Sequence, residues 1–270
     1  MPTLSEIRVY PVKSLDPELV DEARLADSGA LAPDRRYAMV DADGDYVNGK
    51  NERRVHRLRS SYDLETDRLR LREQGTDDWI RFDLDADRGA LESWLTDFFG
   101  YEVTVRRDDE QGFPDDTDAG GPTLVSTGTL DAVASWFDGA AGRPAVDAAE
   151  LRRRFRPNLI VDAPEFWEDR LYADRESTVP FSVGGVDFDG VNPCQRCVVP
   201  TRDPDTGEGD TGFRERFLER REATLPPWVD RDWYDHFYRL MVNTRVPGAP
   251  ATLSVGDSVT CDREMGPDAV

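Results

Sequence analysis

The sequence predicts a mainly β protein of the α+β class, divided into two domains over residues 1–110 and 111–265. Short apolar runs with alternating or β-branched side chains recur along the chain of 270 residues, separated by Gly, Asn, Asp and Pro turns. Only a few segments have apolar residues at helical spacing. An acidic stretch rich in Gly and Pro, residues 107–122, predicts a long loop between the two halves.

The N-terminal half predicts several strands and one helix. The predicted strands cover residues 7–15, 19–26, 31–41, 69–73 and 79–84. We expect the last two to form a β-hairpin. Residues 90–99 carry apolar side chains on one helical face, so we expect a helix whose stripe packs into the core and does not form a cofactor site. This stripe consists of Leu91, Trp94, Leu95, Phe98 and Phe99.

The C-terminal half predicts more strands and three helices. The predicted helices cover residues 127–137, 147–155 and 213–222, and the predicted strands cover 159–161, 178–183, 186–188, 238–244 and 251–259. Ser126 or Thr127 could cap the first of these helices. The free N–H groups at such a helix start also suit an anion. The sequence therefore leaves both a capping and a binding role open for these hydroxyls.

Two of the three cysteines lie in one stretch, residues 190–207. This stretch begins with turn residues and runs apolar through Val198 and Val199, as a short buried strand would. It ends in a strong turn signal, Asp-Pro-Asp-Thr-Gly. We therefore expect Cys194 and Cys197 at a junction between a loop and a strand, where reactive groups are often held.

A cysteine pair at this spacing has several possible roles. A structural zinc site needs four ligands, and beyond the pair the chain offers only Cys261, His56 and His236. A thioredoxin-type redox pair should open a helix, which the turn after Pro200 does not favour. The two thiols could be small buried hydrophobes, or one thiolate could hold a metal-bearing cofactor. The spacing alone leaves these alternatives open.

Four motifs in chain order resemble those of the MOSC family. They are Tyr10-Pro11-Val12-Lys13-Ser14, Asp34-Arg35-Arg36-Tyr37, Phe155-Arg156-Pro157-Asn158 and the double-cysteine motif from Asn192 to Gly207. This family includes the C-terminal domain of molybdenum cofactor sulfurase and the mitochondrial amidoxime reducing component. The resemblance implies an N-terminal β-barrel-like domain followed by a MOSC β-barrel with peripheral helices. It also implies a molybdenum–molybdopterin cofactor, for which a tungsten form is possible.

The same resemblance implies roles for individual residues. Cys197 matches the cysteine that binds molybdenum in the amidoxime-reducing branch, and it would be the catalytic residue. The residues that would hold the pterin and its phosphate are Lys13, Ser14, Arg35, Ser126, Thr127, Arg156 and Asn158. A guanidinium suits a phosphate and an amide suits the edges of a pterin. The sequence departs from the family pattern at an extra residue, Arg36, which could replace Arg35 as the cofactor contact. It also has Asn48 and Lys50 where the family commonly has Thr and Arg.

The activity that the resemblance implies is the two-electron reduction of N-hydroxylated small molecules by a molybdenum oxidoreductase. The electrons would come from a separate ferredoxin or flavin reductase, because a ferredoxin-type cluster needs four cysteines and the chain has three. The alternative is a sulfur carrier, with a persulfide on Cys194 or Cys197, or a cofactor-binding protein without turnover.

The charge and composition limit the possible partners and location. The formal net charge is −21, and only Lys13 and Lys50 among the 34 basic residues are lysine. So acidic a surface predicts a salt-adapted source and argues against nucleic-acid binding. The sequence has no apolar run long enough to span a membrane and no signal peptide, so we expect a cytoplasmic protein. An anionic cofactor would need a local basic pocket.

Overall fold

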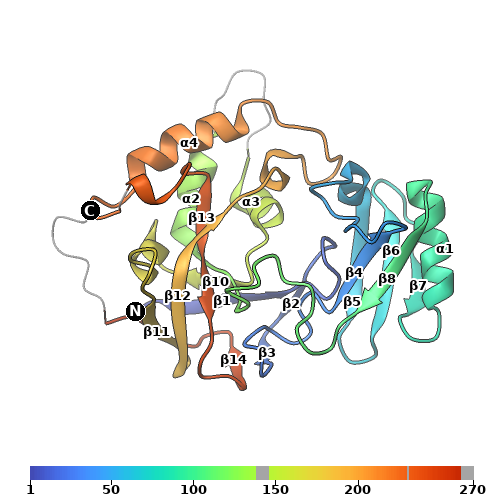
Figure 1. Ribbon diagram of the computed structural model, residues 1–270, viewed down its shortest axis with the longest axis horizontal. Helices are drawn as coiled ribbons and strands as arrows, with labels where there is room; N and C mark the ends of the chain where they lie inside the picture. Colours follow the sequence, from blue (N-terminus) through green and yellow to red (C-terminus); the bar gives the residue numbers. More distant parts are fainter. Residues whose placement is uncertain (138–145, 230, 263–270) are drawn as a thin grey trace.

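Strands dominate the computed structural model, which describes residues 1–137, 146–229 and 231–262 (Figure 1). The strands are β1 (Thr3–Val9), β2 (Glu18–Val20), β3 (Glu22–Leu25), β4 (Tyr37–Asp41), β5 (Leu58–Asp63), β6 (Arg68–Glu73), β7 (Ile80–Asp83), β8 (Val103–Arg107), β9 (Leu124–Ser126), β10 (Leu159–Asp162), β11 (Val179–Val183), β12 (Val186–Gln195), β13 (Arg239–Arg245), β14 (Ala251–Ser254) and β15 (Val259–Thr260). The α-helices are α1 (Arg88–Phe99), α2 (Thr127–Ser135), α3 (Ala148–Phe155) and α4 (Phe213–Thr224). Short 3₁₀ turns are η1 (Arg53–Arg57), η2 (Trp167–Leu171), η3 (Val199–Thr201) and η4 (Arg231–Trp233). This composition confirms the predicted mainly β, α+β class.

Eight strands form one mixed sheet in the order β15-β11-β12-β13-β9-β10-β1-β2. Only β9 and β10 pair in parallel among these described strands. The N-terminal strand β1 joins this sheet beside β10, with Ile7 opposite Leu159. Strand β3 pairs with β14 near the other end of the chain, with Leu25 opposite Ala251. The first 31 residues therefore supply part of the larger body of the protein.

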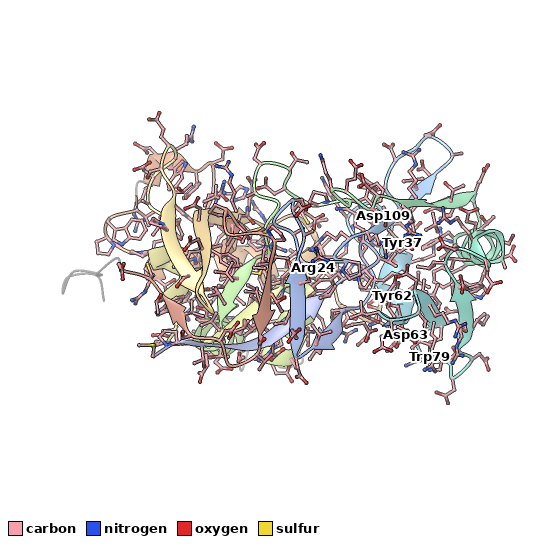
Figure 2. All side chains as sticks on the ribbon, turned by 90° about the horizontal axis from the view of Figure 1, so that it is seen from below. Arg24, Tyr37, Tyr62, Asp63, Trp79 and Asp109 are labelled. Atoms are coloured by element: carbon pink, nitrogen blue, oxygen red, sulfur yellow. The ribbon has the colours of Figure 1, made fainter. Side chains whose placement is uncertain are left out.

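A second, smaller body carries β4 to β8 and α1, at the right of Figure 1. Strand β4 pairs with β8, and β5, β6 and β7 form a separate three-stranded sheet. Leu91, Leu95 and Phe99 of α1 are fully buried in its core, and Trp94 and Phe98 pack against that core. The predicted helical stripe is thus confirmed as a core contact. Figure 2 shows Tyr37, Tyr62 and Trp79 in this body, with Arg24 of β3 at its boundary with the larger one.

The larger body has apolar cores on both sides of its sheet. One core gathers side chains from β1, β3, β10 and β14 with Trp167 and Tyr172. The other joins α2, α3 and α4 to the sheet around Phe155, Phe213 and Phe217. Phe213 also stacks on Phe137, with the two ring centroids 4.3 Å apart. No helix among the described residues is long and apolar enough to cross a membrane.

Several local predictions were wrong. The strand expected over residues 31–41 begins only at Tyr37, and the strand expected over residues 251–259 ends at Ser254. The strand expected over residues 19–26 is broken at Asp21 into β2 and β3, which pair with different partners. Val198 and Val199 do not form a buried strand: β12 ends before them, Val198 is exposed and Val199 begins a 3₁₀ turn. The physical reason is Pro200, which cannot donate to a strand ladder but fits the start of a helical turn.

The predicted division of the chain near residue 110 stays a prediction. The loop expected there is present, because no helix or strand lies between β8 and β9. The pairing of β1 and β3 with strands of the larger body shows, however, that sequence order and spatial grouping differ in this protein.

Candidate functional site

A cavity of about 680 Å³ lies where the two bodies meet. Its walls come from the segment after β1, the loop before η1, the loop between β8 and β9, the end of α3 and the end of β12. Eight Lys or Arg side chains and four Asp side chains line it among the described residues. The cavity therefore has an excess of positive charge inside a chain whose net charge is −21. Such an arrangement favours an anionic ligand.

The structure brings six of the eight predicted site residues to this cavity. They are Lys13, Ser14, Arg35, Arg156, Asn158 and Cys197. The other two, Ser126 and Thr127, lie outside it. These six residues come from four separate stretches of chain, and the pairing of β1 with β10 brings the first of these stretches beside the Arg156–Asn158 segment.

Lys13 follows β1 and is held at its backbone, where its N–H donates to the Tyr37 carbonyl at 2.8 Å. Its side chain is buried, and Nζ donates to the carbonyls of Phe113 at 2.9 Å and Pro114 at 3.4 Å and to the Asp115 carboxylate. Burial lowers the pKa of Lys13, although Asp115 acts in the opposite direction. Lys13 is thus a partly desolvated cation that is strongly attracted to an anion.

Arg35, and not Arg36, lies in the cavity. The Arg35 N–H donates to the Tyr10 carbonyl at 2.6 Å, and its guanidinium lies 5.3 Å from the centre of the Tyr10 ring. Its Nη1 donates to the neighbouring Asp34 carboxylate. Arg36 points away from the cavity and pairs with Asp67 at 3.1 Å. The extra residue in the motif therefore leaves the first arginine facing the cavity.

Arg156 and Asn158 differ in whether their side-chain donors remain available to a ligand. Arg156 follows α3, donates to the Leu15 carbonyl at 2.7 Å and packs its guanidinium 4.2 Å from the Tyr10 ring centre. Burial, followed by the nearby positive charge of Arg35, lowers the pKa of Arg156. The Asn158 amide is buried and already bonded, because Nδ2 donates to Arg8 O and Asp34 Oδ1, both at 3.1 Å. We infer that Asn158 positions its neighbours and that Arg156 is available to an anion.

The cysteines lie at the end of β12. Arg196 Nη1 donates to Cys194 Sγ at 2.9 Å, and Nη2 donates to the Phe155 carbonyl at 2.9 Å. Cys197 is exposed, and its Sγ accepts from the backbone N–H of Val199 at 3.5 Å. Both thiols are unpaired and both line the cavity. An accessible thiol of this kind can act as a soft metal ligand or a nucleophile.

Ser126 and Thr127 have structural contacts instead. Ser126 is fully buried, caps α2 by accepting from Thr129 N at 3.1 Å, and donates to the Pro164 carbonyl at 2.8 Å. Thr127 Oγ1 lies 3.4 Å from Asp162 Oδ1 and from the Ala163 carbonyl. The helix start at which an anion could bind is therefore engaged within the protein, and it does not face the cavity.

Three cavity residues that the sequence did not predict as cofactor contacts help to shape the site. Tyr10 supplies the ring beneath two guanidiniums, and its place at the head of the first motif was the available signal. Asp115 bonds to Lys13 and Arg35, but nothing separates it in sequence from the other acids of its loop. Burial, opposed by a hydrogen bond to the Gly49 carbonyl, lowers the pKa of His56 to about 4, so this imidazole is neutral near pH 7.

Comparison with known protein families gives two matches. The MOSC N-terminal beta barrel domain matches residues 1–144, and the MOSC domain matches residues 123–260. The chain belongs to the MOSC family. MOSC domains are associated with proteins that bind the molybdenum cofactor. Among the described residues of this MOSC protein, no group of three or more His, Cys, Asp or Glu side chains could hold a metal ion.

No curated protein matches this MOSC protein. Among solved structures, the YUAD protein from Bacillus subtilis aligns over 96% of this chain and 94% of its own, at 12% sequence identity and a TM-score of 0.39.

Proposed function

We propose that this MOSC protein binds molybdenum–molybdopterin, or its tungsten form, in the cavity between the two bodies. The observation that carries the proposal is the meeting of an exposed, unpaired thiol, Cys197, with an excess of cationic side chains in one cavity. A molybdenum centre is compatible with a thiolate ligand, and a pterin phosphate needs positive partners.

The residues present fit such a group. Lys13, Arg35 and Arg156 form a cation cluster suited to the phosphate, and Ser14 lines the same cavity. Cys197 would supply the thiolate to the metal. The cofactor, when bound, would supply the oxygen-atom and electron transfer that the reduction of an N-hydroxylated compound requires.

The protein's own residues would orient and insulate the cofactor. Tyr10 supports the guanidiniums of Arg35 and Arg156 from one side, which limits the conformations they can adopt. His56, with its lowered pKa, would remain neutral at the site and would not add another positive charge. The electrons would come from a separate donor such as a ferredoxin or a flavin reductase, and the substrate would be a small molecule.

One observation favours a second candidate function, sulfur transfer. The guanidinium of Arg196 donates to Cys194 at 2.9 Å, which suits a sulfur that carries negative charge, and Cys194 lines the same cavity as Cys197. A persulfide on Cys194 could be passed to a partner. We place this candidate second because it gives no role to the cation cluster.

Metal analysis tests the two candidates. The protein is purified without oxygen from a host that makes molybdopterin, alongside Cys197→Ser and the matched control Cys261→Ser, whose thiol lies outside the cavity lining. We expect about one molybdenum or tungsten per chain in the wild type and in Cys261→Ser, a much lower content in Cys197→Ser, and little iron or sulfide.

Full metal content in Cys197→Ser would overturn the assignment of the thiolate ligand. Metal-free wild-type protein with a persulfide on Cys194, detected by mass spectrometry, would support sulfur transfer. If metal is present, reduction of a benzamidoxime by chemically reduced protein tests the activity directly, and its absence would contradict the reductase.

A further inference from the structure

The loop between β8 and β9, residues 108–122, lies across the junction of the two bodies, and we call it the strap. In its first half, Phe113 N–H donates at 2.8 Å to the carbonyl of Arg35, two residues before β4 of the smaller body. The strap is fixed to the larger body, where Gly121 N–H donates to the Thr244 carbonyl at 2.9 Å. The strap thus forms one wall of the cavity and is anchored near both ends.

In its middle, the strap places a carboxylate on the cation cluster. Asp115 Oδ1 accepts from Lys13 Nζ, and Oδ2 accepts from Arg35 Nε at 3.3 Å. Two strap carbonyls, those of Phe113 and Pro114, accept from Lys13 as well. Within the part of the chain that the structure describes, the hydrogen bonds of Lys13 Nζ therefore all go to the strap.

The exposure of these side chains shows which group is fixed and which can leave. Only 8% of the Lys13 side chain and 12% of the Arg35 side chain are exposed, whereas 69% of the Asp115 side chain is exposed. The cations belong to the wall of the cavity, and the carboxylate reaches them from the solvent side. A bound anion could displace it without disturbing the core.

The electrostatics agree with this geometry. Although much of the Asp115 side chain is exposed, partial desolvation beside the cavity wall acts to raise its pKa. The charges of Arg35, Lys13 and Arg156 outweigh this effect and hold that pKa well below its usual range. The three cations that attract Asp115 are the same three that we assign to a phosphate. A carboxylate and a phosphate cannot share these donors at close range, because their like charges repel.

We propose that Asp115 is an internal ligand of the phosphate subsite, occupying the cation cluster until a phosphate ester displaces it together with the centre of the strap. The inference rests on the proposed function in one respect, that the cluster binds a phosphate. When an internal group occupies a binding site, the apparent affinity for an external ligand equals its intrinsic affinity multiplied by the fraction of molecules whose site is free. Asp115 would therefore set how strongly an anion must bind in order to enter.

Calorimetric titration with inorganic pyrophosphate tests the proposal on purified full-length protein. Asp115→Asn and Asp115→Ala remove the internal carboxylate, and Asp118→Asn removes the same charge from an exposed position on the same strap. We expect pyrophosphate to bind roughly tenfold more tightly to both Asp115 variants, because the competing ligand is gone, and to bind Asp118→Asn within about twofold of the wild type.

Hydrogen exchange gives an independent measurement. If pyrophosphate displaces Asp115, amides in residues 113–116 of the wild type should exchange faster when the anion is bound. Weaker or unchanged binding in the Asp115 variants, or slower exchange of these amides on binding, would overturn the proposal and make Asp115 a structural or ligand-contacting residue.

Failure of this proposal can be told apart from failure of the proposed function. Metal-free protein whose Asp115 variants still gain pyrophosphate affinity would reject the molybdenum proposal and keep the internal ligand. Metal-loaded protein whose Asp115 variants bind pyrophosphate no more tightly than the wild type would keep the molybdenum proposal and reject the internal ligand.

Discussion

At the residue scale, the cavity is marked by unusual backbone conformations. Six described residues other than glycine have positive φ, and four of them line the cavity: Ser14 at 74°, Arg35 at 51°, Arg156 at 56° and Met241 at 71°. Such conformations cost free energy for side chains of this size. Three of the four were predicted to contact the cofactor. Their concentration at one place supports the view that the backbone is held there to aim side chains at a ligand.

A buried carboxyl away from the cavity predicts a pH effect on stability. Burial, followed by the charge of Asp169, raises the pKa of Glu168 to about 7 from an ordinary value of 4.5. Between these values the native state binds more protons than the unfolded state, so the free energy of unfolding should fall as pH rises through this window. The shift corresponds to roughly 3 kcal/mol.

The test compares urea unfolding at pH 5 and pH 8. Glu168→Gln should gain stability relative to the wild type at pH 8, while the exposed Glu165→Gln should follow the wild type at both values. A constant difference between Glu168→Gln and the wild type would show that Glu168 is not protonated in the native state at low pH.

At the scale of elements, the predicted site residues in the cavity follow the ends of strands and helices and do not lie within them. Lys13 follows β1, Arg156 follows α3 and Cys197 follows β12, so each side chain leaves a regular element at the cavity. The elements themselves are held by buried apolar contacts, and their ends are free to adopt the irregular backbone that the site needs. Ser126 is the exception, because this residue at the start of α2 lies outside the cavity and its hydroxyl caps the helix and donates to the Pro164 carbonyl.

The cap of α2 gives a prediction that separates structure from binding. Ser126→Ala removes the buried cap and the bond to Pro164, so we expect a loss of about 1–2 kcal/mol in the free energy of unfolding. Thr127→Ala should cost less than about 0.5 kcal/mol, because its two contacts are long and partly exposed. Pyrophosphate affinity should be unchanged in both. A tenfold loss of that affinity in either variant would restore a binding role to the hydroxyl.

At the scale of the whole molecule, strands from the N-terminal half belong to the larger body, and both bodies contribute residues to the cavity. Leu4, Ile7 and Val9 of β1 are fully buried in the larger body, although they lie within the segment that matches the N-terminal domain. A cavity with excess positive charge forms where the bodies meet, inside a strongly acidic chain. We therefore expect the cavity to form only when both bodies are correctly joined.

Division of the chain tests this dependence. Expressed alone, residues 111–270 lack β1 and β3, which leaves β10 with β9 as its neighbour on one side and leaves β14 without its partner β3. Each lost apolar side chain costs roughly 2 kcal/mol, so the five buried residues Leu4, Ile7, Val9, Leu25 and Leu31 approach the whole stability of a typical domain. We expect no cooperative unfolding transition from this fragment, and recovery of one when residues 1–110 are co-expressed. A cooperative transition from residues 111–270 alone would show that the boundary near 110 separates independent units.

The sequence by itself determined the fold class, most of the elements and the family. The β6–β7 hairpin, the core stripe of α1 and the helix starts were predictable because they depend on side chains close together in the chain. The four motifs also named six residues that the structure brings to one cavity. The apolar pattern at Val198 predicts a strand, but Pro200 cannot donate to a strand ladder and a 3₁₀ turn forms instead.

Only the tertiary structure decided which charged side chains face each other. Arg35 and Arg36 are equivalent in sequence, and the Tyr10 carbonyl and ring distinguish them. The sequence does not distinguish Asp115 from the other acids of its loop, but the strap places its carboxylate against Lys13. In the sequence Ser126 resembles a phosphate contact, but in the structure its hydroxyl donates to the Pro164 carbonyl and accepts from the Thr129 N–H. The contacts of Arg35 with Tyr10, of Ser126 with Pro164 and of Asp115 with Lys13 join residues 25, 38 and 102 positions apart. No local pattern of polarity specifies contacts at such separations.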